Sequence, residues 1–302
     1  MNSILVGTAK RALTPASGHW SPAPALMPSR FRKFAQNVLR RWPWAYSRAR
    51  RGYSRVSYRL RIPHEAEFKL FAALQGSEGL FADVGANTGQ SARSLRIYND
   101  SLEILSFEPN PLLEPDLAFT KRLLKSRFEY RMVGLGSETG QAMLAVPMLG
   151  TMPQSAWATA DRTALEASRT KIEAWIGGRF DIVEAPIEII RFDSLDLHPI
   201  AAKIDVEGCE SEVLKGMEET LRCDEPLLML EHSEGADEII AWLSERGYTV
   251  YLYDAAANCL RPELPRRTTN YFACTASWLS RFPSVAGLIE ERDVKPVQVS
   301  RN

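Results

Sequence analysis

The sequence predicts an α/β fold in which a mostly parallel sheet of about seven strands carries helices on both faces. Three observations predict this fold. Short apolar runs of strand length alternate with segments of helical periodicity over residues 65–254. Several of these runs end in acidic residues, which would gather the acids at one edge of the sheet. The chain of 302 residues is 45% apolar and 25% charged, which is ordinary for a globular protein.

The predicted elements follow one another in short steps. The first is a helix over 65–76, because four apolar side chains between positions 68 and 74 fall on one stripe before Gly76. Further helices are predicted over 91–98, 115–124, 210–221 and 236–247. Strands are predicted over 79–85, 102–108, 128–136, 185–192, 201–208, 226–232, 248–254 and 270–276, with a further candidate at 141–147.

Composition divides the chain into four parts. Residues 1–27 are rich in Ala, Ser and Pro and are predicted to be a disordered leader. Residues 28–62 form a basic, aromatic-containing arm that is predicted to be helical, and 63–280 form the α/β domain. Within that domain, 148–182 is expected to be an irregular insertion or a lid, because the alternating pattern stops there. Residues 281–302 are expected to be a C-terminal tail.

Charge is distributed unevenly along the chain. Residues 1–64 hold thirteen Lys or Arg and no acid, whereas the remainder carries a net charge of −13. The arm therefore admits several interpretations. Its helices could pack on the domain with their arginines in water, or attach to an anionic membrane surface or a phosphate-bearing partner. The leader also has the composition of an organelle transit peptide. No known nucleic-acid-reading motif accompanies the charge, which argues against nucleic acid.

The sequence also limits the location and the metal content of the protein. No run of eighteen apolar residues occurs, so no membrane-spanning helix is expected and the predicted location is cytoplasmic, with peripheral membrane attachment left open. The four cysteines (209, 223, 259 and 274) form no CxxC pair, which argues against zinc and favours free thiols in a reducing compartment. No other metal-ligand spacing occurs, so no metal site is predicted.

The segment FADVGANTG (81–89) predicts a cofactor turn after a buried strand. Gly85 and Gly89 bracket the turn and let a ligand approach the backbone. A dinucleotide fingerprint would need a second glycine where Asn87 stands, so a pyrophosphate would meet a side chain. A cofactor with an amino acid tail fits better, because Asp83 can face its ammonium group and the turn amides its carboxylate.

The next predicted strand ends in Glu108, about twenty residues after the turn. A carboxylate at this position can accept hydrogen bonds from both hydroxyls of an adenosine ribose. Nucleotide cofactors and S-adenosylmethionine share this requirement. Together with the Gly turn, Glu108 favours S-adenosylmethionine.

The order of several segments resembles the FkbM family of methyltransferases. These segments are DVGANTG, FEPNP (107–111), IRFDSL (190–195), KIDVEGCESEVLKG (203–216), a strand ending in Glu231, and a late NYF (270–272). The resemblance covers roughly residues 63–275. KIDVEG followed by the ExxVLxG helix is its most specific part, and the basic arm and 148–182 lie outside it.

This resemblance implies a Rossmann-like class I methyltransferase that uses S-adenosylmethionine and usually methylates a hydroxyl oxygen. By position, Asp83, Gly85 and Asn87 match the cofactor loop, and Glu108 matches the ribose-binding acid. Gly89 closes the same turn. Asp205 and Glu207 match the acidic motif after the fourth core strand.

Methyl transfer to a hydroxyl needs alignment of the reactants and removal of a proton. The candidate bases are Asp205, Glu207 and Glu231, with His232 beside them, and Asp205 could instead orient the cofactor. The predicted acceptor is a sugar, a glycan or another small metabolite. Two alternatives remain: an RNA methyltransferase that uses the Arg-rich arm, and a cofactor-binding scaffold without catalysis.

Overall fold

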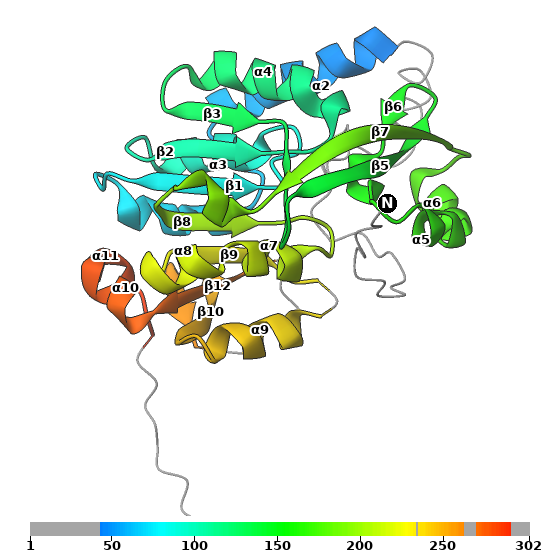
Figure 1. The fold of residues 1–302 in the computed structure, drawn as a ribbon. Coiled ribbons are helices and arrows are strands. Elements are labelled where there is room, and N and C mark those ends of the chain that lie inside the picture. Colours follow the sequence, from blue (N-terminus) through cyan, green and yellow to red (C-terminus); the bar gives the residue numbers. More distant parts are fainter. Residues whose placement is uncertain (1–42, 234, 263–269, 291–302) are drawn as a thin grey trace, which may run out of the picture.

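The main sheet of the computed structural model has eight strands, and β1 is the third from one edge (Figure 1). The structure describes residues 43–233, 235–262 and 270–290. In spatial order the strands are β11 (Cys259–Arg261), β10 (Tyr248–Asp254), β12 (Asn270–Thr275), β9 (Leu227–Glu231), β8 (Pro199–Ile204), β1 (Leu80–Val84), β2 (Glu103–Phe107) and β3 (Phe128–Arg131). Neighbours from β9 to β3 pair in parallel, and the other pairs are antiparallel.

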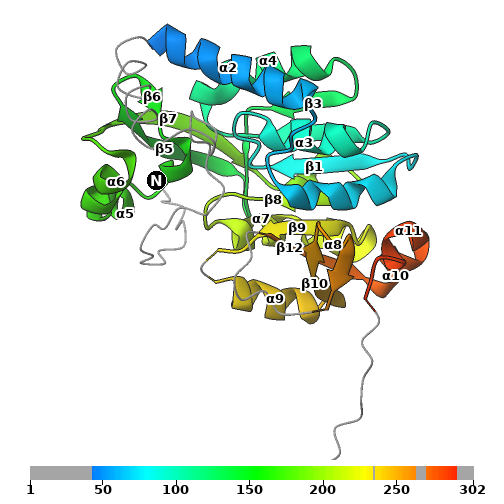
Figure 2. The ribbon, with the colours of Figure 1, turned by 180° about the vertical axis from the view of Figure 1, so that it is seen from behind.

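Helices cover both faces of this sheet (Figure 2). The α/β fold is thereby confirmed, and the short β11 is the strand that the sequence did not predict. One face carries η1 (Ala66–Leu74), α3 (Gln90–Tyr98), α4 (Glu114–Leu124), α10 (Ala276–Arg281) and α11 (Pro283–Ala286). The other carries α7 (Glu210–Gly216), α8 (Glu218–Cys223) and α9 (Ala236–Ser244). Side chains of β9 alternate between the two cores, with Leu227 and Met229 in one and Leu228 and Leu230 in the other.

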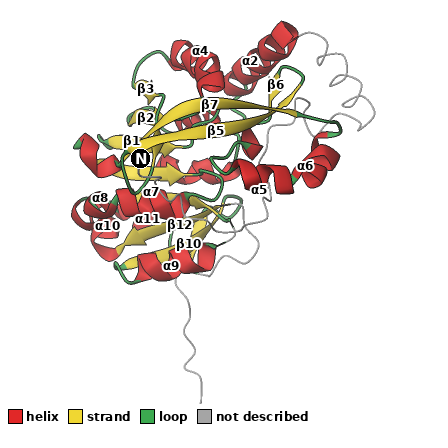
Figure 3. Ribbon diagram, turned by 45° about the vertical axis from the view of Figure 1, so that its right-hand side comes forward, coloured by secondary structure: helices red, strands yellow, loops and turns green. Residues whose placement is uncertain are grey.

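A second sheet stands across the carboxyl ends of the main one (Figure 3). Its order is β4 (Gly134–Leu135), β7 (Asp181–Ile190), β5 (Gly140–Leu149) and β6 (Met152–Pro153). The run 128–136, predicted as one strand, is therefore divided between β3 and β4. β4 ends in close contact with β7, because a Cβ on Gly136, directly after β4, would lie 2.9 Å from Ile189 Cγ2.

Most of residues 148–182 have regular structure, where the sequence suggested an irregular insertion. After β6 come η3 (Ser155–Trp157), α5 (Arg162–Ala167) and α6 (Arg169–Ile176). A small separate core of Ala145, Trp157, Leu165, Ile172 and Phe180 holds them against β5 and β7. These helices are too short to show a clear helical period in the sequence, which explains why the alternation of strands and helices cannot be followed through 148–182.

Two predicted helices have a different form in the structure. Residues 66–74 form the 3₁₀ helix η1, and 210–221 are divided into α7 and α8. The division follows Gly216, where a Cβ would meet the backbone oxygen of Gly136 at 2.0 Å. This close approach fixes the end of α7 against the second sheet. The short η2 (Pro111–Leu113) and η4 (Phe192–Leu195) complete the elements.

The described part of the arm is the helix α2 (Pro43–Arg59), which packs on α3 and α4. Arg50 and Arg51 both pair with the buried Asp116 of α4, and the Arg51 Nε–Asp116 Oδ1 distance is 3.3 Å. The predicted leader 1–27 and the first half of the arm lie outside the described residues.

The folded domain continues beyond residue 280, where the sequence placed its end. Val285 is buried, and the amide of Leu260 donates to the carbonyl of Leu288 at 2.7 Å. Residues 291–302 of the expected tail lie outside the described part. None of the helices in the described ranges has the length and apolar character needed to cross a bilayer.

Candidate active site

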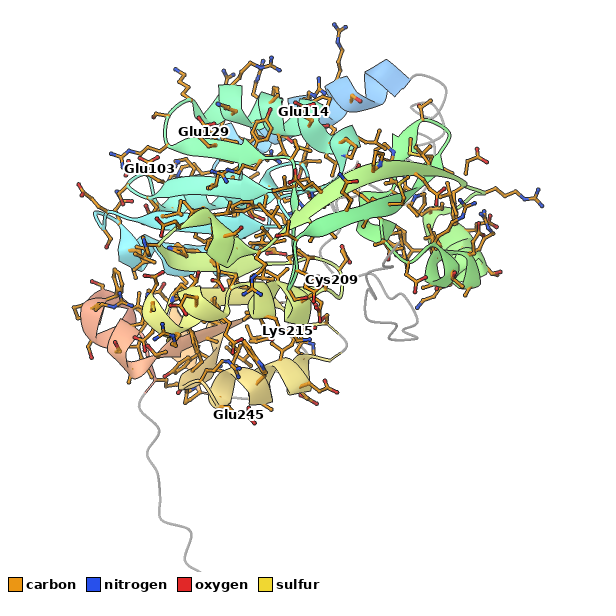
Figure 4. All side chains as sticks on the ribbon, viewed as in Figure 1. Glu103, Glu114, Glu129, Cys209, Lys215 and Glu245 are labelled. Carbon is orange, nitrogen blue, oxygen red and sulfur yellow. The ribbon has the colours of Figure 1, made fainter. Side chains whose placement is uncertain are left out.

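A cavity of about 1160 Å³, counting the open solvent at its mouth, lies at the carboxyl ends of β1, β2, β8 and β9. The second sheet forms its opposite wall. Cys209, labelled in Figure 4, lines it between the two sheets. The acids that line it are Glu65, Glu108, Asp205, Glu207 and Glu231. The strand-end acids therefore meet in one place, with the exception of Asp83.

The turn after β1 depends on glycine at its start. The amides of Gly85 and Ala86 both donate to the carbonyl of Phe107, at 3.0 and 3.1 Å. Gly85 has a φ of +82°, and a Cβ there would lie 1.7 Å from the carbonyl oxygen of Asp205. β1 and β8 can therefore end side by side only with glycine at this position.

The remainder of the turn divides its contacts between the cavity and α4. Asn87 lines the cavity with a φ of +49°. Gly89, the N-cap of α3, lies outside the cavity lining, and a Cβ at this position would be 2.8 Å from Thr120 Oγ1. Gly89 thus allows α3 to pack closely on α4. It would affect cofactor binding only through the shape of the turn.

Glu108 lies at the floor of the cavity and is held by the backbone. The amide of Asn87 donates to its Oε2 at 2.7 Å, and the amide of Asn110 donates to its Oε1 at 2.9 Å. Burial raises the pKa of Glu108 to about 7 despite these two bonds. The carboxyl is thereby fixed in orientation beside the turn, where a pair of ligand hydroxyls could approach it.

Asp83 lies beneath the turn and has no exposed surface. Ser106 Oγ donates to its Oδ2 at 2.7 Å, and burial raises the pKa of Asp83. It does not line the cavity, so the structure does not bring it to face a ligand ammonium as the sequence suggested. Its position supports β1 and β2 from below instead.

A buried lysine is the positive centre of the acidic cluster. Lys203 of β8 donates from Nζ to Asp205 Oδ2 at 2.8 Å and is only 2% exposed. The charges of Asp205, Asp83 and Glu65 raise its pKa although burial opposes the ammonium form. Lys203 therefore remains charged and holds Asp205 in place. It was not among the site residues predicted from sequence, although a lysine inside an apolar strand signals such a pair.

Glu207 and Glu231 lie on either side of Asp205. Burial and the neighbouring Asp205 raise the pKa of both carboxyls, and Glu231 shares a hydrogen bond with Asp205. Carboxylates this close cannot all ionise, so a proton is retained in the cluster at neutral pH. Glu207 has a φ of +55°, and its side chain is only partly buried. The three acids predicted as catalytic candidates thus lie together and influence one another's ionisation.

His232 follows Glu231 but does not line the cavity. Its ring lies edge-on to Tyr271, with centroids 6.4 Å apart. Among the described residues, no group of three or more His, Cys, Asp or Glu is arranged to hold a metal ion.

Glu65 is a cavity residue that was not predicted from sequence. It lies before η1, lines the cavity, and has a mostly buried carboxyl that shares a hydrogen bond with the side chain of Asn270. Burial raises its pKa to about 7, with Lys203 acting in the opposite direction. Only its place as the first acid after an acid-free arm could have drawn attention to it.

Replacement of Glu65 by glutamine is expected to stabilise the protein at pH 8 but not at pH 5. A raised folded-state pKa means that the folded protein binds the proton more tightly, so stability falls as pH rises from about 4.5 to about 7. Glutamine cannot ionise, so above pH 7 the variant should have a free energy of unfolding up to about 3 kcal/mol higher than that of the unchanged protein. Chemical denaturation at pH 5 and pH 8 measures this difference. The same difference at both pH values would show that ionisation of Glu65 is not its cause.

The wall opposite the acids is largely apolar. Leu144, Ile187 and Ile189 of the second sheet line it, together with Ser155 and Thr159. Ser155 Oγ lies 3.3 Å from Asn87 Oδ1, so the wall touches the turn after β1 directly. One side of the cavity can therefore bind charged or hydrogen-bonding groups, and the other an apolar surface.

The sheet order, with a Gly turn after β1 and a fixed acid after β2, defines a class I methyltransferase fold. The chain belongs to the FkbM methyltransferase family, because the family model for the methyltransferase FkbM domain matches residues 83–250. Among curated proteins, no significant match was found.

Solved structures of methyltransferases are similar to the chain at low identity. The FkbM methyltransferase of Methylobacillus flagellatus KT is 15% identical, with a TM-score of 0.43 over 67% of this chain, which spans about half (47%) of that protein. Precorrin-6y C5,15-methyltransferase of Geobacter metallireducens is 10% identical, with a TM-score of 0.37 over 69% of this chain and 84% of that one. TrmK of M. capricolum, solved with S-adenosylhomocysteine, is 10% identical, with a TM-score of 0.31 over 69% and 66%.

Proposed function

We propose that this protein transfers a methyl group from S-adenosylmethionine to a hydroxyl of a sugar, a glycan or another small metabolite. The observation that carries the proposal is the meeting of Glu108, the Gly85 turn and the acids Asp205, Glu207 and Glu231 at one cavity. Family membership supports methyl transfer. The acceptor class and the oxygen target rest on the chemistry of the cavity alone.

The residues at the β1–β2 end of the cavity fit this cofactor. Glu108 would accept from the ribose hydroxyls, because two backbone amides hold its carboxyl toward the cavity. The turn at Gly85 and Asn87 exposes backbone for the amino acid tail, and Asp205 lies at the other side of that turn. When bound, S-adenosylmethionine supplies a methyl group on a positively charged sulfur, which the surrounding acids favour electrostatically.

Within the acidic cluster, we infer that Glu207 is the general base. Asp205 is tied to Lys203 and shares a hydrogen bond with Glu231, so both of these acids are engaged in holding the cluster. Glu207 combines a raised pKa with a partly exposed position in the cavity. A carboxylate with a raised pKa is a stronger proton acceptor, and a hydroxyl must lose its proton as the new oxygen–carbon bond forms.

The acceptor class follows from the two walls. The acids would repel phosphate groups, which argues against a nucleic acid and favours an uncharged, hydroxylated molecule. The apolar side chains of Leu144, Ile187 and Ile189 would cover the face of a sugar ring or another small acceptor. Product analysis by mass spectrometry should find the added methyl group as a base-stable ether.

Glu108→Ala is expected to weaken binding of S-adenosylmethionine by at least about 100-fold, because two hydrogen bonds to the carboxylate are lost and each contributes about 1.5–3 kcal/mol. Calorimetry with purified protein measures this. Glu103→Ala is the matched control, since Glu103 lies exposed at the opposite end of the same strand (Figure 4). If both variants bind as the unchanged protein does, Glu108 has no ribose role.

A further inference from the structure

The outer helix α2 has an inverted distribution of polarity. Its packed side buries Arg50 and Ser54, whereas Val56 and Leu60 are 54% and 65% exposed. Of the eight large apolar side chains exposed in the described residues, four lie between Tyr53 and Ile62. An amphipathic helix on a globular domain normally buries its apolar stripe. Here Arg50 and Arg51 pair with Asp116, and this polar contact anchors α2 together with the partly buried Tyr58, which packs on the core.

The exposed side of α2 consists of two adjoining stripes. Tyr53, Val56 and Leu60 share one stripe at a spacing of three and four residues. The neighbouring stripe is basic. We name the two stripes together the α2 patch, which consists of Tyr53, Val56, Leu60, Arg48, Arg55 and Arg59. No acid occurs in α2 or in any residue before Glu65, so the patch has one sign of charge.

We propose that the α2 patch binds an anionic membrane surface. An apolar stripe beside a basic one is the pattern of helices that lie in the plane of a bilayer interface. Lipid headgroups would pair with the arginines while the apolar side chains enter the headgroup boundary. A nucleic acid would use the arginines but leave Val56 and Leu60 without a contact. The outer position of α2, beside α4 at one side of the molecule, leaves its exposed face accessible (Figures 1 and 2).

Docking through this patch would bring the cavity near the lipid surface. Leu60 of the patch is 65% exposed, and His64, four residues later, lines the cavity. Four residues of chain span at most about 14 Å. Binding does not depend on methyl transfer, so the two proposals can fail separately.

Cosedimentation of the full chain with vesicles tests the proposal. Vesicles of phosphatidylcholine with about one third phosphatidylserine are expected to bind, and pure phosphatidylcholine much less. R55E/R59E should weaken binding at least about 25-fold, counting about fivefold for each arginine. V56S/L60S should weaken it about tenfold, because exposed apolar area is lost without disturbing the core.

The matched control is M143S/V183S, which removes two exposed apolar side chains from the second sheet and should bind as the unchanged protein does. Thermal unfolding checks that each variant folds. If R55E/R59E does not fold, vesicle binding by V56S/L60S is the result that tests the proposal. Equal binding to both kinds of vesicle would overturn the proposal, as would full binding by the α2 variants. Binding to a single-stranded oligoribonucleotide that R55E/R59E abolishes and V56S/L60S preserves would assign the patch to nucleic acid instead.

Discussion

Glu207→Gln is expected to lower kcat for methyl transfer by about two to four orders of magnitude, the usual contribution of a general base. Glutamine keeps the shape of the side chain and its positive φ but cannot take up the acceptor proton. Affinity for S-adenosylmethionine should stay within about threefold, because Glu108 and the Gly85 turn are unchanged. Initial rates and calorimetry separate these two effects.

The pH profile provides a second measurement for the same variant. The pKa of Glu207 is raised, and a base acts in its deprotonated form, so kcat of the unchanged protein should increase as pH rises. Glu207→Gln should lose this rise. Glu212→Gln, on the following helix and bonded to Ser137 and Lys215, is the matched control and should retain full activity. An unchanged kcat in Glu207→Gln would indicate that Asp205 or Glu231 is the general base instead.

Gly85→Ala is expected to destabilise the fold by about 2–5 kcal/mol and to abolish cofactor binding. A left-handed backbone costs a non-glycine residue about 1–2 kcal/mol. The new Cβ would also lie 1.7 Å from the carbonyl oxygen of Asp205, and such overpacking adds about 1–3 kcal/mol. Separation of β1 from β8 would move the turn away from Asp205 and so open the cofactor end of the cavity.

Gly247→Ala is the control for backbone strain alone. Its φ of +83° matches the +82° of Gly85, but a Cβ there has no atom within 4 Å. Chemical denaturation should therefore find a loss of about 1–2 kcal/mol in Gly247→Ala and a distinctly larger one in Gly85→Ala. Equal losses in the two variants would show that the strand ends can separate without cost.

Much of the main sheet could be predicted from sequence, because its strands are buried apolar runs with turn residues at their ends. The predicted strand over 226–232 corresponds to β9, and its acid Glu231 lies in the cavity as the position of a strand end implies. Local patterns predicted the two long strands of the second sheet, over 141–147 and 185–192, but not that they leave the main sheet. Strand β4 has only two residues, and its close neighbours at Gly136 and Gly216 come from distant parts of the chain.

The same limit applies to the positions of the site residues. Asp83 and Glu108 both end strands, but only three-dimensional packing shows that Asp83 lies beneath the turn and Glu108 beside the cavity. Glu65 reaches the cavity from outside the sheet, and Lys203 points to the acids from within β8. The sequence predicts at which end of which strand a residue lies. Its neighbours, however, depend on contacts between segments that are distant in the chain.

The second sheet is a single continuous stretch of chain, from Gly134 to Ile190, placed between β3 and β8. The opposite side of the cavity is assembled from the ends of four separate strands of the main sheet and cannot be moved as a unit. The wall that would receive the acceptor is therefore a cassette, that is, one continuous segment that can be replaced as a whole. A chimera that takes this cassette from another family member would exchange one acceptor preference for another while keeping the donor site, which gives protein engineers a defined pair of splice points.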